Sequence, residues 1–103
     1  MSCYFVVQVN CRNESQRKVY DEYIREVKPI VESYQGQYII RSENIISIDH
    51  QWHPDRFIVI EFPDLEHLNQ CFHSSEYLHI SKKRESSVES HAIIVGGIDS
   101  ENI

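Results

Sequence analysis

The sequence predicts one α+β domain in which a four-stranded antiparallel sheet carries two helices on one face. Two observations predict this class. Short segments rich in β-branched and aromatic residues, as strands are, lie at 4–10, 37–42, 56–62 and 91–96. Longer segments at 13–34 and 64–88 repeat apolar residues every three or four positions, as amphipathic helices do. The resulting order is the split β-α-β arrangement of ferredoxin-like folds.

The first half of the chain gives a strand, a long helix and a second strand. Segment 4–10 is the first strand, and the helical pattern begins at Asn13. Pro29 lacks the N–H that would bond to the carbonyl of Arg25, so we expect a kink or a restart there. Gly36 is expected to stop the helix. Segments 37–42 and 45–50 read as one long or broken strand with a bulge or tight turn at 43–44.

The second half begins with a loop at 52–55 and the most strand-like segment of the chain, 56–62. Asp64 then offers an N-cap to the second helix, which Ser74 and Ser75 interrupt or re-cap. The last strand is 91–96. A chain of 103 residues has the size of one domain, which we expect over 1–98, with a loose tail over 99–103.

The strands have apolar residues on both faces, although a two-layer protein needs them on only one. Phe57 and Val59 point to one side of their strand, and Ile58, Ile60 and Phe62 point to the other. Strands 4–10 and 91–96 repeat the pattern. We therefore expect the face turned away from the helices to pack on a second copy, giving a homodimer.

Charge and composition exclude several classes of function. Ten basic residues against sixteen acidic ones give a net charge of −6, which disfavours nucleic acid as a partner. Apolar runs are too short to span a membrane, and the first residues lack the features of a signal peptide. The three cysteines show no disulfide or zinc spacing, so we expect a cytoplasmic protein with the whole chain retained. Because nucleotide and phosphate motifs are missing from the sequence, we expect no cofactor.

Several phrases of the sequence resemble a known family. They are Gly36-Gln-Tyr-Ile-Ile-Arg41, Trp52-x-Pro54-x-Arg56, Ile58-Val-Ile-Glu-Phe-Pro-Asp64, His73-Ser-Ser-Glu-Tyr77 and a later Arg84. Over nearly its whole length the chain resembles the small bacterial proteins called domain of unknown function thirteen-thirty. The resemblance implies the dimeric α+β barrel fold, in which two ferredoxin-like protomers press their sheets together around a cavity. It implies no particular activity.

Glu61 is the first candidate for chemistry. It lies mid-strand on the face of Phe57 and Val59, where a buried, unpaired carboxylate would have a raised pKa and suit a general base. The alternative is a structural ion pair with Arg41 or Arg56. His73 is the second candidate base. The pair His50 and His53 predicts no metal site, because no third ligand stands at a diagnostic spacing.

The candidate ligand-binding residues are Arg41, Trp52, Tyr77 and Arg84. Trp52 would form an aromatic wall for a small organic ligand, or a plug over the sheet end. Tyr77 and Arg84 share a helix face two turns apart, where they could hold an anion or a phenol, or simply pack as core and rim. We expect Tyr20 and Tyr23 to be core and rim residues as well.

These candidates predict a cavity between sheet and helices, lined by Trp52, Glu61, Arg41 and Tyr77, that binds a small and largely apolar molecule. Two other functions stay open. One is a cofactor-independent monooxygenase- or isomerase-like enzyme with Glu61 or a nearby histidine as base. The other is a purely structural or interaction homodimer.

Overall fold

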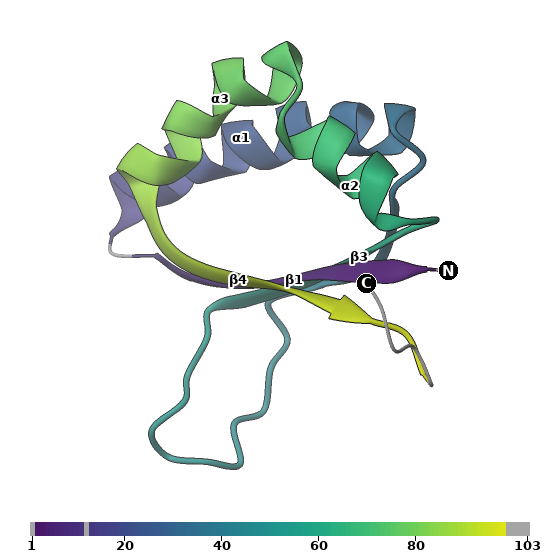
Figure 1. Cartoon of the computed structure of the whole chain (residues 1–103). Helices are drawn as coiled ribbons and strands as arrows, with labels where there is room; N and C mark the ends of the chain where they lie inside the picture. Colours follow the sequence, from purple (N-terminus) through teal and green to yellow (C-terminus); the bar gives the residue numbers. More distant parts are fainter. Residues whose placement is uncertain (1, 12, 99–103) are drawn as a thin grey trace.

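The computed structural model describes residues 2–11 and 13–98 and, within them, places three helices over one face of a four-stranded antiparallel sheet (Figure 1). The expected tail, 99–103, lies outside the described residues. The elements are β1 (Cys3–Cys11), α1 (Glu14–Ser33), β2 (Gln37–Ser42), β3 (Arg56–Phe62), α2 (Leu65–Phe72), α3 (Ser75–Ser87) and β4 (Val88–Gly96). The strand order is β2-β3-β1-β4. The α+β, ferredoxin-like prediction is therefore confirmed.

Short polar side chains cap each helix, as the sequence predicts for Asp64 and Ser74. The side chain of Asn13 accepts a hydrogen bond from the backbone N–H of Gln16 at 2.9 Å. Asp64 does the same for α2, and Ser74 for α3. The second helical segment is thus two helices, and the expected re-capping at Ser74 is confirmed. β4 follows α3 directly and begins at Val88, three residues before the expected start at His91.

The kink or restart expected at Pro29 is wrong in one respect, because α1 continues through this residue to Ser33 without a restart. Proline removes one hydrogen bond to the carbonyl four residues earlier, here that of Arg25. Both Pro29 and Arg25 are exposed, so that carbonyl lies on the solvent side of the helix. Burial of the opposite stripe, which includes Tyr23, Val27 and Val31, holds the helix to the sheet.

The expected helix stop at Gly36 is also corrected, because Gln35 takes the left-handed position with a φ of 66°. The N–H of Gly36 donates to the carbonyl of Val31 at 2.9 Å, and the N–H of Gln35 donates to that of Glu32 at 3.0 Å. This pair of bonds is a Schellman motif, which satisfies carbonyls of the last helical turn. Gly36 serves another purpose, since it is buried where α1 meets Phe62.

The strand expected at 45–50 is wrong, because residues 43–55 form a loop, here called the arm, on the side of the sheet away from the helices (Figure 1). β2 is an edge strand whose only neighbour, β3, begins at Arg56, so 45–50 has no strand to pair with. The expected bulge at 43–44 lies instead between Tyr38 and Ile40.

Side chains at the base of the arm hold both of its ends. The carboxylate of Glu43 is bonded by Arg17 and by Arg56, the latter at 2.7 Å. At the other end, Asp55 accepts from the backbone N–H of Cys11 at 2.8 Å. The arm therefore leaves the sheet from a fixed base.

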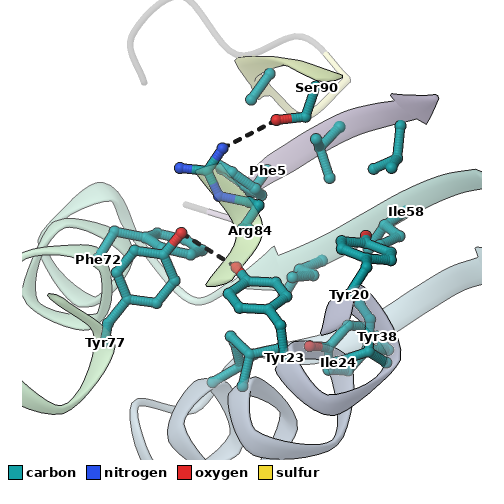
Figure 2. A pocket seen from close by; sticks show the side chains of 16 residues that line it. Phe5, Tyr20, Tyr23, Ile24, Tyr38, Ile58, Phe72, Tyr77, Arg84 and Ser90 are labelled. Atoms are coloured by element: carbon teal, nitrogen blue, oxygen red, sulfur yellow. Dashed lines mark hydrogen bonds between the residues drawn. The ribbon is translucent and has the colours of Figure 1, made fainter. Parts of the chain in front are cut away.

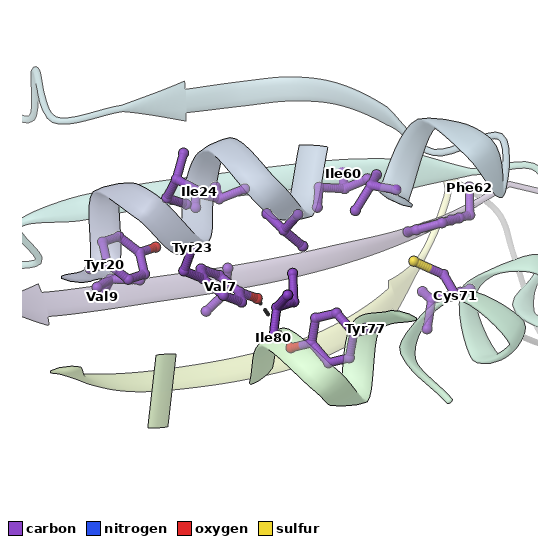
Figure 3. Close-up of a cluster of buried hydrophobic side chains, with 14 of the residues drawn as sticks. Val7, Val9, Tyr20, Tyr23, Ile24, Ile60, Phe62, Cys71, Tyr77 and Ile80 are labelled. Atoms are coloured by element: carbon purple, nitrogen blue, oxygen red, sulfur yellow. Dashed lines mark hydrogen bonds between the residues drawn. The ribbon is translucent and has the colours of Figure 1, made fainter. Parts of the chain in front are cut away.

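The core lies between the sheet and the helices, and one end of it lies against α2 (Figure 3). There Phe62, Cys3 and Cys71 are fully buried, beside Val31 of α1. Gly36 closes this end of the core. A Cβ built on it would lie 2.5 Å from Cγ1 of Val31 and 2.9 Å from Cε1 of Phe62, closer than atoms can pack.

We predict that Gly36→Ala destabilises the protein by roughly 1–3 kcal/mol, because the added methyl group overpacks the core. Urea denaturation followed by circular dichroism measures this. Gly97→Ala is the matched control, since its Cβ would meet nothing closer than 3.7 Å and should change stability little. Equal stability of the two variants would contradict the close approach at Gly36.

Candidate functional site

A cavity of about 330 Å³ lies between the sheet and the helices (Figure 2). Its walls are apolar and aromatic, and they come from β1, β2, β3 and β4 and from α1, α2 and α3. Its principal lining residues are Phe5, Val7, Val9, Ile58 and Ile60 from β1 and β3, Tyr20, Tyr23, Ile24 and Val27 from α1, and Tyr38, Phe72, Tyr77, Arg84, Ser90 and Ala92. Because Ala92 is exposed and lies on the edge strand, the cavity reaches the surface along β4.

Tyrosine hydroxyl groups supply most of the polarity of the cavity. The hydroxyl of Tyr23 donates to the hydroxyl oxygen of Tyr77 at 3.1 Å, which joins α1 to α3 (Figure 2). Burial raises the pKa of Tyr23 and of Tyr20, and it raises the pKa of Tyr38 to about 12. These phenols are therefore neutral at neutral pH and can donate hydrogen bonds.

Arg84 is the cationic residue of the cavity. Its Nη1 donates to Oγ of Ser90 at 2.9 Å, linking α3 to β4. Its Nε is buried and has no hydrogen-bond partner among the described residues. Burial lowers the pKa of the guanidinium, but the neighbouring phenols of Tyr77 and Tyr23 outweigh this, so the pKa is raised and the charge is kept.

Of the residues expected to line the cavity, the structure places Tyr77 there, together with Arg84. Arg41 lies outside it and reaches it only through Tyr38, whose ring it covers at 5.2 Å. The expected lining by Trp52 and Glu61 is wrong, because both lie on the face of the sheet that the helices do not cover, here called the open sheet face. His73 is exposed at the end of α2, where its Nδ1 lies 2.8 Å from the carbonyl oxygen of Asn69.

Glu61 lies on the open sheet face, as its alternation with Phe57 and Val59 indicates. The hydroxyl of Tyr4 donates to its Oε2 at 3.1 Å. The ion pair considered for Glu61 is replaced by this tyrosine contact, while Arg56 pairs with Glu43 instead. The reason is geometric, because Tyr4 is the direct cross-strand partner of Glu61.

Trp52 belongs to the arm and packs against the open sheet face. Its Nε1 donates to Oε1 of Gln8, and its ring meets Phe57 edge to face at 6.5 Å between centroids. A shallow apolar groove of about 580 Å³ separates the arm from the sheet here, with Ile40 on the sheet side and Ile46 and Ile48 on the arm.

Sequence reasoning missed four polar residues of the cavity, namely Tyr20, Tyr23, Tyr38 and Ser90. The signal in the sequence was the pair of tyrosines on the apolar stripe of the first helix, where aliphatic residues pack more simply. Phenols there need partners for their hydroxyl groups, which is a reason to expect a polar pocket.

Within residues 2–11 and 13–98, histidine, cysteine, aspartate and glutamate side chains form no group that could hold a metal ion. None of the helices α1, α2 and α3 is long and apolar enough to cross a membrane.

A family model described as "Domain of unknown function (DUF1330)" matches residues 2–98. A search among curated proteins finds no match.

Solved structures show the same fold at low sequence identity. A protein of unknown function from Rhodopseudomonas palustris is 16% identical with a TM-score of 0.80, covering 96% of this chain and 84% of that one. A dimeric ferredoxin-like protein of unknown function from Jannaschia sp. CCS1 is 10% identical with a TM-score of 0.80, covering 94% and 100%. SnoaB, a cofactor-independent oxygenase from Streptomyces nogalater, is 6% identical with a TM-score of 0.67, covering 97% and 96%. At these identities the likeness establishes the fold.

We predict that the protein loses stability in alkaline solution through its buried phenols. A phenol whose pKa is raised by folding stabilises the protein below the unfolded pKa of about 10, and this stabilisation is lost as the pH rises toward the folded value. The free energy of unfolding in urea should therefore fall above pH 10 or so. Tyr38→Phe should make the fall shallower. Identical slopes in both proteins would contradict burial of the neutral phenol.

Proposed function

The chain belongs to the family described as "Domain of unknown function (DUF1330)", and on this premise we propose that it is a homodimeric protein that binds a small, largely apolar molecule between its sheet and its helices. The observation that carries the proposal is the cavity itself. Its volume of about 330 Å³ lies at the small end of the range of ligand sites, about 300–1,000 Å³. Apolar walls with a few converging polar groups are typical of such sites.

The arrangement of the polar groups also supports binding. The hydroxyl groups of Tyr23 and Tyr77 and the guanidinium of Arg84 come from two helices and meet at one place in the cavity (Figure 2). A core evolved only for packing would fill this volume with aliphatic side chains, because buried polar groups cost free energy unless they find partners.

We predict that ligands enter beside Ala92 and that a larger side chain there blocks them. The probes are 2-naphthoate, decanoate and their neutral amides, and thermal shift and calorimetry report binding. Ala92→Phe should abolish binding of whichever probes the natural protein takes. Ala92→Ser, at the same position without the bulk, should leave binding unchanged. If none of the four probes binds the natural protein, the ligand-binding proposal fails.

The dimer is proposed through the open sheet face. Apolar side chains that no helix covers lie there, including Ile93 on β4, which is 60% exposed, and Trp52 under β3. The arm adds Ile46 and Ile48 on the same side of the sheet, which are 89% and 95% exposed (Figure 1). Exposed apolar side chains gathered on one side of a protein are typical of interfaces. The dimeric description of the Jannaschia protein of the same fold agrees with this placement.

We predict that Ile93→Glu and Val59→Glu convert the dimer to a monomer at micromolar concentration, because each buries an unpaired charge between the sheets. Light scattering measures the mass. Gln70→Glu, which adds the same charge on exposed α2, is the control and should remain dimeric. A natural protein that is monomeric and folded under these conditions would overturn the proposed dimer.

A catalytic function is the second candidate, as a cofactor-independent monooxygenase- or isomerase-like enzyme. The fold shared with SnoaB is compatible with it. The cavity offers phenols and one guanidinium, but the residues that line it include no carboxylate or imidazole to act as base. Glu61 as base would work at the open face, beside Tyr4 and near the second copy. A dimer without any ligand is the remaining alternative, and the probe experiment above separates it from the binding proposal.

A further inference from the structure

The cavity holds a positive charge that the protein does not neutralise inside it. Building on the ligand-binding proposal above, we infer that the natural ligand is a monoanion with a planar carboxylate-like group, and that Arg84 holds this group while the apolar body lies along β1 and β3. Aspartate and glutamate are missing from the lining residues, and the lining tyrosines Tyr20, Tyr23 and Tyr38 stay neutral. The Arg84 side chain is 29% exposed, and a largely buried charge without a counter-charge in the cavity is costly. An anionic ligand would pair with a charge that the lining residues leave without a partner.

The hydrogen bonds of Arg84 leave donors free on the cavity side. Ser90 satisfies Nη1 but is neutral. Glu85 is the acidic residue in contact, at 3.9 Å from Nη2, and its side chain is 64% exposed, so the pair is weak and lies toward solvent. Nε is buried with no partner in the described part of the chain. An arginine with free N–H groups is suited to bind both oxygens of one carboxylate.

The tyrosine pair adds a neutral donor to the same place. Because the hydroxyl of Tyr23 donates to the oxygen of Tyr77, the proton of Tyr77 is left for another acceptor. Tyr77 and Arg84 both come from α3, and both line the cavity. One guanidinium and one phenol together match a carboxylate. A phosphate monoester carries almost two negative charges and would need a second cation, which the lining residues do not provide.

The test compares an acid with its neutral amide of the same shape, using the whole chain of 103 residues and isothermal titration calorimetry. 2-Naphthoate should bind at least about tenfold more tightly than 2-naphthamide, as a charge-assisted hydrogen-bonded pair requires. Arg84→Met should reduce the affinity for the acid to that for the amide. Arg84→Lys, which keeps the charge but not the planar fork, should lie between. Arg25→Met removes an exposed guanidinium on α1 and should change neither affinity.

The possible outcomes distinguish an anionic ligand from ligand binding in general. If acid and amide bind equally, and Ala92→Phe abolishes both, the cavity binds neutral ligands and the anionic assignment is wrong. If the acid is preferred but Arg84→Met keeps that preference, the anion lies elsewhere and the assignment is equally wrong. If neither probe of either pair binds, the cavity is not a ligand site and the proposed function itself is wrong. Circular dichroism of each variant confirms that it is folded.

Discussion

The structure depends on a shortage of helix relative to sheet. β1 and β3 carry apolar side chains on both faces, but the three described helices cover only one face (Figure 1). On the covered side, α1 and α3 together cross the sheet while short α2 seals the end near Phe62. On the other side, Ile93, Trp52 and the arm remain in contact with water. The two faces are therefore unequal, because one encloses a cavity and the other leaves apolar side chains uncovered by helices.

The cavity exists because aromatic rings with polar ends replace aliphatic side chains at the middle of the helical layer. Near α2, Phe62, Cys3 and Cys71 are fully buried. Farther along, Tyr23 of α1 and Tyr77 of α3 meet through their hydroxyl groups. Each ring is held by its helix at one end and by the hydroxyl contact at the other, so it cannot move toward the sheet. Packing between these rings and the sheet therefore stays incomplete.

The sequence was sufficient to predict the fold, because strand composition and helical period are local properties. It predicted the two-faced strands, the cap at Asp64 and the re-capping at Ser74. It failed where position depends on distant contacts. Residues 45–50 have strand-like composition, but no neighbouring strand is there to pair with them. Glu43, just after β2, instead forms ion pairs with Arg17 and Arg56. The cavity was expected, but its lining was assigned partly to the wrong face, because Trp52 and Glu61 lie across the sheet from Tyr77.

Because both ends of the arm are held by hydrogen bonds, its conformational entropy is already reduced in the folded protomer. Flexible loops resist binding because their conformational entropy must be given up when a partner orders them. Here Glu43 and Asp55 fix the two ends before any partner arrives, through Arg17, Arg56 and the backbone of Cys11. Much of that entropy has therefore been lost during folding of the protomer. The ends of the arm are thus fixed on folding, so a partner that packed on Ile46 and Ile48 would have less conformational entropy to remove.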